Sequence, residues 1–199
     1  GDAACALVKD VPGVRLWPAS ALGVEGLGQM SFYYDITEFN TALKPSAILA
    51  LFEEGYDAVT YFDPDIEVFS STKPLEELLS RYELLLTPHI SSPAEEDGLF
   101  PSVQACIHAG QFNLGFISVR DTPQVRAFLH WWVRRLRESC LMEPNYWLFV
   151  DQFWASAGPS FVDETRVVRS EAWNMAYWNY GHRTLRRENG RFVTGDGPL

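Results

Sequence analysis

Short apolar runs along the chain alternate with longer segments in which apolar positions recur at helical spacing. Residues 58–62 and 83–87 are largely apolar runs that stop at Asp63 and Pro88, which is typical of buried strands. We expect the run at 58–62 to be covered on both faces. Extended segments are expected at residues 58–62, 66–69, 83–87, 112–119 and 166–168.

Helical segments fill most of the intervals between these runs. Pro45 and Ser46 precede a helix that Gly55 ends, and Pro74 begins another. The clearest helix covers residues 123–137, where apolar side chains form one stripe and arginines occupy the rest of the surface. Helices are also expected at residues 47–54, 102–109 and 150–156. The alternation of strands and helices predicts an α/β fold with a largely parallel sheet.

The composition fits one compact domain of 199 residues, of which 47% are apolar and 21% are charged. The formal net charge of −10 would repel a polyanion, so we expect no nucleic-acid partner. Cys5, Cys106 and Cys140 lack paired spacing, which argues against a disulfide framework or a zinc knuckle. No apolar run reaches membrane-spanning length, and no signal peptide is recognisable. We therefore expect a cytoplasmic protein without a transmembrane segment, and peripheral attachment to a membrane stays open.

Two carboxylates stand directly after the apolar run at 58–62, in Asp63-Pro64-Asp65. Open α/β sheets bind ligands at the carboxyl ends of their strands, and carboxylates one residue apart can face one hard divalent cation. With 11 aspartates in the chain, an Asp-x-Asp pair is expected by chance roughly 0.6 times. The metal hypothesis therefore rests on the position of this pair directly after a strand. The alternative is a capped turn in which the Asp side chains accept hydrogen bonds from local amides.

Other polar residues interrupt apolar or aromatic segments. Asn113 lies in the predicted strand at 112–119 and is either a structural hydrogen-bond hub or a ligand contact. Asp151 and Gln152 lie among aromatic residues, where Asp151 is either a helix N-cap or a functional group. Lys44 could counter a phosphate. Six of the seven tryptophans stand between residues 131 and 178, as core residues or as platforms for sugar rings.

Taken in order, six segments resemble a bacterial glycosyltransferase of the GT-A type, similar to glycosyltransferase family 8. These segments are residues 34–45, 61–66, 86–90, 112–116, 149–153 and 173–179. The resemblance implies an α/β, GT-A-like fold in which helices flank a mixed sheet. It also implies that a hexose is transferred from a nucleoside-diphosphate sugar, most simply a UDP-sugar, to a saccharide or another hydroxyl acceptor, with retention at the anomeric carbon.

The same resemblance implies a role for each matched polar residue. Asp63 and Asp65 would hold Mn²⁺ or Mg²⁺ against the diphosphate. The donor would be bound by Lys44, His89 and Asn113. The acid–amide pair beside the transferred sugar, and hence the catalytic pair, would be Asp151 and Gln152.

The chain departs from the family pattern near both ends. GT-A enzymes begin with a strand and helix that hold the nucleotide base, and they close with a histidine motif that supplies a third metal ligand. Neither is found here. We therefore expect residues 1–199 to form a single GT-A-like catalytic domain that is truncated at both ends. Two other functions stay open: a sugar-nucleotide nucleotidyltransferase and a carbohydrate-binding module without catalysis.

These roles make a geometric prediction. Asp63 and Asp65 should lie at the carboxyl end of a central strand and face an open cleft. The side chains of Lys44, Asn113, Asp151 and Gln152 are expected to line the same cleft, within about 15 Å of the Asp pair.

Overall fold

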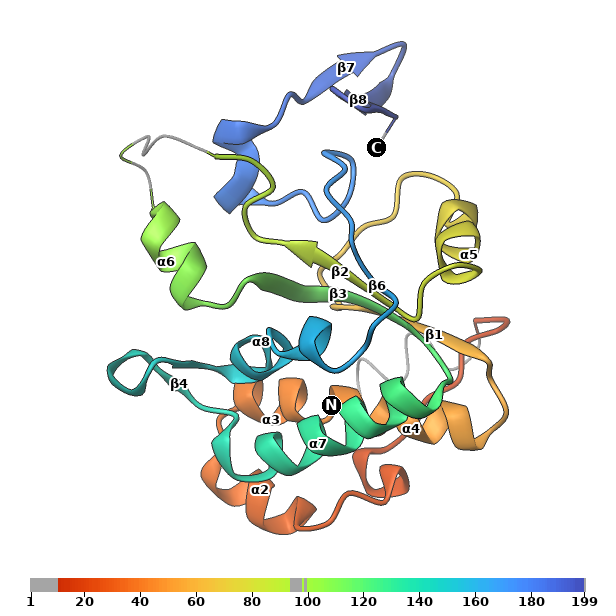
Figure 1. Cartoon of the computed structure of the whole chain (residues 1–199), viewed down its shortest axis with the longest axis vertical. Coiled ribbons are helices and arrows are strands. Elements are labelled where there is room, and N and C mark those ends of the chain that lie inside the picture. Colours follow the sequence, from red (N-terminus) through yellow and green to blue (C-terminus); the bar gives the residue numbers. More distant parts are fainter. Residues whose placement is uncertain (1–10, 94–97, 99, 199) are drawn as a thin grey trace.

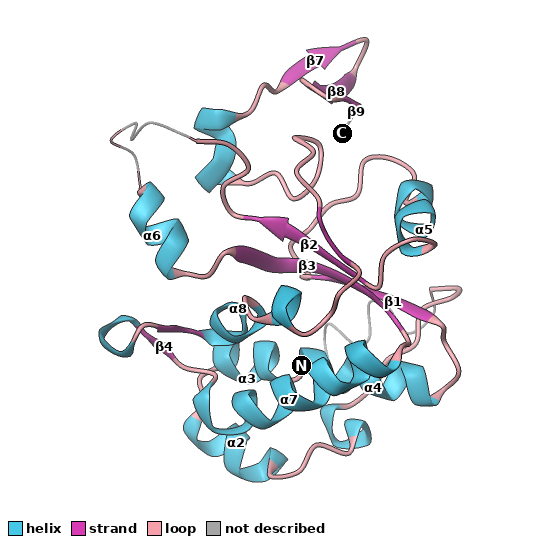
Figure 2. Ribbon diagram, viewed as in Figure 1, coloured by secondary structure: helices cyan, strands magenta, loops and turns pink. Residues whose placement is uncertain are grey.

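The computed structural model describes residues 11–93, 98 and 100–198, so Cys5 lies outside the described residues. Helices cover both sides of a central sheet (Figure 1 and Figure 2). The α-helices are α2 (Leu27–Tyr33), α3 (Ile36–Ala42), α4 (Lys44–Glu53), α5 (Lys73–Leu79), α6 (Val103–His108), α7 (Pro123–Ser139) and α8 (Val150–Ala155). Short 3₁₀ turns are η1 (Ala19–Leu22), η2 (Pro144–Tyr146), η3 (Gly158–Ser160) and η4 (Tyr177–His182).

The central sheet has the strand order β1 (Ala58–Phe62), β3 (Phe112–Arg120), β2 (Leu84–Pro88) and β6 (Thr165–Val167). Strand β3 is antiparallel to both β1 and β2, and only β2 and β6 are parallel. The sheet is therefore mixed, and the expectation from the alternation that it is largely parallel is wrong. Alternation of apolar runs with helices does not fix the direction in which a later strand returns.

Strand β1 is an outer strand of the described sheet, so the expectation that it is central is wrong. It is also not covered on both faces, because Ala58 and Phe62 are exposed while Val59 is buried. The expected strand at 66–69 is absent from the described structure, where these residues form a loop with Val68 and Phe69 half exposed. The other expected strands, and the helices, are confirmed to within about three residues of their predicted bounds.

Two smaller sheets lie outside the central one. Strands β4 (Met142–Glu143) and β5 (Leu148–Phe149) form a hairpin, and β7 (Arg186–Glu188), β8 (Arg191–Thr194) and β9 (Gly197–Pro198) form a small sheet near the C-terminus. None of the helices in the described part of the chain combines the length and the apolar character that a membrane crossing requires.

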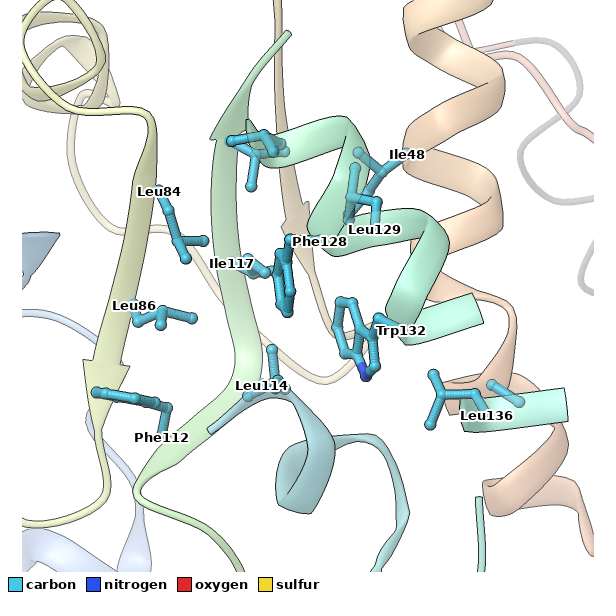
Figure 3. Close-up of a cluster of buried hydrophobic side chains, with 14 of the residues drawn as sticks. Ile48, Leu84, Leu86, Phe112, Leu114, Ile117, Phe128, Leu129, Trp132 and Leu136 are labelled. Carbon is cyan, nitrogen blue, oxygen red and sulfur yellow. The ribbon is translucent and has the colours of Figure 1, made fainter. Parts of the chain in front are cut away.

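The main core lies between the sheet and helices α4 and α7. Ile117, Phe128 and Trp132 pack together there at or below 1% exposure, and Phe128 stacks on Trp132 (Figure 3). A smaller cluster lies against α5 and includes Leu85 and Phe116. Burial of this apolar surface is the main force that orders the sheet, and it fixes where the carboxyl end of β1 lies.

We expect Ile117→Ala to lower the free energy of unfolding by about 2–5 kcal/mol, because Ile117 is fully buried in β3. Ile117→Val should cost about 0.5–1.5 kcal/mol at the same site. Urea unfolding measures both. Val68→Ala, on the exposed loop, is the control and should change stability by no more than about 0.5 kcal/mol. Equal losses for Ile117→Ala and Val68→Ala would contradict this description of the core.

Candidate functional site

A cavity of about 680 Å³ opens at the carboxyl end of β1. The loop that follows β1 forms one wall, and residues 170–178 form another. Asp63, Asp65 and Asn113 line this cavity, and β3 contributes Gly115 and Phe116. The expectation that the Asp pair lies at a strand end and faces a cleft is therefore confirmed, although the strand is an outer one.

The Asp63 carboxylate is held from its buried side. The Tyr61 hydroxyl donates to Asp63 Oδ1 at 2.7 Å, and Lys44 Nζ lies 3.3 Å from the same oxygen. The Asp63 amide donates to the Gly115 carbonyl at 2.8 Å, which continues the pairing of β1 with β3 past the strand end. Within the described residues, no local amide donates a hydrogen bond to the Asp63 carboxylate, so the capped-turn alternative does not apply to Asp63.

Lys44 is the buried centre of the site. Its side chain is only 2% exposed, and its ammonium lies 2.8 Å from Asp151 Oδ2, closer than it lies to Asp63. The ammonium also donates to the Leu114 carbonyl at 2.8 Å and lies 4.8 Å from the centre of the Tyr61 ring. One cation thus balances two carboxylates, each from a different element of the fold.

Asp151 is 1% exposed, and burial raises the pKa of its carboxyl group while the nearby Lys44 ammonium opposes that rise. Asp151 Oδ1 has no hydrogen-bond partner within the described structure, so the ammonium of Lys44 is its main compensation. Phe149 is the N-cap of α8, and Asp151 stands inside the first turn. The N-cap alternative for Asp151 is therefore wrong.

Gln152 orients the polar end of β3. Its Oε1 accepts hydrogen bonds from Asn113 Nδ2 at 3.2 Å and from the Leu114 amide at 3.0 Å. Its Nε2 donates to the Ala109 carbonyl at 3.3 Å. Because one amide side chain bonds to three partners, Gln152 fixes both the strand end and the Asn113 side chain.

His89 completes this network on the other side of Asn113. Its Nδ1 donates to the Gly110 carbonyl at 2.8 Å, and its Nε2 accepts from Asn113 Nδ2 at 3.3 Å. This pattern requires the neutral ring with its proton on Nδ1. Burial lowers the pKa of His89, which agrees with the neutral form.

Four of the predicted site residues are near the cavity but do not line it in the described structure. The expectation that Lys44, Asp151 and Gln152 line the cleft is wrong, because all three are buried where α4 and α8 pack on the main-core side of the sheet. The expectation that they lie close to Asp63 is confirmed, because Lys44 Nζ lies 3.3 Å from Asp63 and 2.8 Å from Asp151. His89 lines a second cavity of about 510 Å³ beside α6. Lys44 is nevertheless paired with Asp63 and with Asp151, and both His89 and Gln152 are hydrogen-bonded to Asn113.

Two contributors to the site have no role in the sequence prediction. Tyr61 reads as one more apolar strand residue, yet its hydroxyl bonds to Asp63. Asn174 donates from Nδ2 to Thr87 Oγ1 at 2.8 Å and to Asn113 Oδ1 at 2.7 Å, with a left-handed φ of 53°. The signal for Asn174 is its segment, residues 173–179, where Asn174 directly follows a tryptophan as Asn113 directly follows a phenylalanine.

The carboxylates of Asp63 and Asp65 could hold a divalent cation only in an open site, where other molecules supply most of the ligands. Asp65 is exposed and makes no side-chain hydrogen bond or ion pair with other described residues, so its carboxylate is available. No group of three or more His, Cys, Asp or Glu side chains in the described ranges could hold a metal ion. Two carboxylates leave most of the coordination shell of Mg²⁺ or Mn²⁺ to water and to oxygens of a ligand.

We expect Lys44→Met to lower the free energy of unfolding by about 3–5 kcal/mol, because it leaves the buried Asp151 carboxylate without its cation. Urea unfolding with a circular-dichroism signal measures the loss. Lys73→Met, at the exposed start of α5, is the control and should stay within about 0.5 kcal/mol of the wild type. A loss below about 1 kcal/mol for Lys44→Met would contradict the arrangement described above.

The stability of the protein should also depend on pH through His89. An unfolded-state histidine has a pKa near 6.5, and the native pKa of His89 is lower, so only the unfolded state gains this proton just below pH 6.5. Stability from His89 is therefore complete above pH 6.5 and falls as the pH drops toward the native value. Unfolding free energies between pH 7.5 and 5 should show a shallower dependence for His89→Gln than for the wild type. Parallel curves for His89→Gln and the wild type would refute the prediction.

Comparison of the chain with models of protein families, with curated proteins and with solved structures finds no match in any of the three searches. The mixed α/β architecture therefore rests on the structure itself, and the function has to be argued from the geometry of this site.

Proposed function

We propose that this chain is a GT-A-like, metal-dependent glycosyltransferase domain. It transfers a hexose from a nucleoside-diphosphate sugar, in the first instance a UDP-sugar, to a saccharide or another hydroxyl acceptor. The proposal rests on the way in which distant polar residues come together in the fold. Lys44, Asp63 and Asp151 form one charged cluster, although they are spread over more than a hundred residues. Asn113 and Gln152 form a second, hydrogen-bonded cluster, and both clusters bond to the Leu114 backbone beside one cavity.

The cavity suits a sugar nucleotide in size and in lining. Its volume of about 680 Å³ lies within the range of roughly 300–1,000 Å³ that is common for small-molecule sites. Trp173, Tyr177 and Trp178 line it, and aromatic rings of this kind stack on the apolar faces of sugars. Asn113 also lines the cavity, with its amide group already bonded to Gln152, His89 and Asn174.

The charges around the cavity support metal dependence. Four carboxylates line it, those of Asp63, Asp65, Glu67 and Asp196, whereas no Lys, Arg or His is among the described lining residues. A diphosphate would be repelled by this lining unless a cation entered with it. A divalent cation held by Asp63 and Asp65 would supply that neutralisation and would stabilise the departing diphosphate.

The buried residues have supporting tasks in this proposal. Lys44 neutralises Asp63 from behind, and Asp151 keeps Lys44 in place. Gln152 orients Asn113. Since neither Asp151 nor Gln152 lines the cavity, we assign both as positioning residues rather than as groups that touch the sugar. Retention at the anomeric carbon belongs to the same proposal and follows from the family resemblance.

Carbohydrate binding without catalysis is the second candidate, and the aromatic lining of the cavity favours it. A binding module has no use for a lysine that secures an aspartate at the rim, so the transferase explains more of the site. Mn²⁺-dependent hydrolysis of UDP-glucose or UDP-galactose in the absence of an acceptor would distinguish the two, because only the transferase activates the bond to the diphosphate.

We expect calorimetry to show that UDP binds weakly without metal and more tightly with Mn²⁺, and that Asp65→Ala abolishes the gain. The reason is that Asp65 supplies one of only two protein carboxylates on the cation. Asp57→Ala is the matched control, since Asp57 is an exposed aspartate just before β1, at the opposite end of the strand.

Tight UDP binding that ignores Mn²⁺ and survives Asp65→Ala would overturn the proposed mechanism. Wild-type protein that shows no Mn²⁺-dependent binding of UDP would also count against it, whereas a loss caused equally by Asp57→Ala would mean that the effect is not local to the pair.

A further inference from the structure

Tyr61 is placed to control the orientation of Asp63. The two residues are two positions apart on an extended chain, so their side chains leave the same face of β1. The Tyr61 hydroxyl donates to Asp63 Oδ1 at 2.7 Å, and the Tyr61 ring supports the Lys44 ammonium at 4.8 Å from its centre. One side chain therefore contacts both members of the Asp63–Lys44 ion pair.

These contacts decide which carboxylate oxygen remains for a ligand. Oδ1 of Asp63 is engaged by two donors, the Tyr61 hydroxyl and the Lys44 ammonium. Oδ2 lies beside Gly115, where an added Cβ would stand 3.4 Å from it, and Gly115 lines the cavity. Oδ1 is therefore the engaged oxygen, whereas Oδ2 lies beside a residue of the cavity lining that Asp65 also shares.

We propose that Tyr61 is a positioning residue for the cation site, because its hydroxyl holds Asp63 Oδ1 and so turns Oδ2 toward the cation that Asp65 shares. The inference rests on the proposed function, since it assumes a divalent cation at this pair of carboxylates. A purely structural Tyr61 would instead affect folding stability and leave cation affinity unchanged.

Titration with Mn²⁺ alone tests the proposal. Mn²⁺ is paramagnetic, and Trp173 and Trp178 line the same cavity, so quenching of tryptophan fluorescence reports binding without any catalytic assay. Tyr61→Phe keeps the ring against Lys44 and removes only the hydroxyl. We expect about tenfold weaker Mn²⁺ binding, the scale of one hydrogen bond to a charged group, with little change in Tm. Tyr56→Phe, at an exposed tyrosine just before β1, should leave the affinity unchanged.

The outcomes of the titration separate the positioning role of Tyr61 from the proposed function. Wild-type binding that Tyr61→Phe leaves unaltered would overturn the positioning role and leave the proposed function standing. Absence of Mn²⁺ binding by the wild type, with and without UDP, would overturn both. If Tyr61→Phe does not fold, a crystal structure of the wild-type Mn²⁺ complex decides the matter: contact through Asp63 Oδ2, with Tyr61 still on Oδ1, supports the role, and contact through Oδ1 overturns it.

Discussion

The arrangement of the site depends on one buried ammonium group. Lys44 lies at the start of α4 and is 2% exposed, between Asp63 after β1 and Asp151 in α8. Burying the charges of Lys44 and Asp151 is costly, and the cost is offset only while Lys44 stays within ion-pair distance of its carboxylate partners. The ion pairs can form only when the main core has brought α4, β1 and α8 together. The core and the site therefore depend on each other.

This dependence produces two layers with different tasks. The buried layer of Lys44, Asp151 and Gln152 pairs its polar groups with one another and with the backbone, apart from Asp151 Oδ1, and it sets the direction of the side chains above it. The exposed layer lines the cavity, and Asp63 belongs to both layers because one of its oxygens is held from behind. Groups that are held in this way can meet a ligand with little reorganisation, which is what binding and catalysis both require.

Sequence patterns predicted most elements, because the residues of a helix or a strand that face the core recur at a fixed spacing along the chain. They failed where the outcome depends on distant contacts. The direction of β3 and the outer place of β1 depend on how the helices pack, which the period does not encode. Asp63 was predictable from its place after a strand. The burial of Lys44 was not, since a lone lysine in a sequence does not reveal partners that stand 19 and 107 positions away. The role of Tyr61 was missed for the opposite reason. Its ring fits an apolar strand, so the sequence does not indicate that its hydroxyl bonds to Asp63.

The central claim, that Lys44 couples these elements through charge, is tested most directly by a double-mutant cycle on Lys44 and Asp151. Unfolding free energies of the wild type, Lys44→Met, Asp151→Asn and the double variant give the coupling energy of the pair. We expect strong non-additivity, at least about 2 kcal/mol, because the charge that Lys44→Met leaves uncompensated is absent from the double variant. Additive effects within about 0.5 kcal/mol would contradict it.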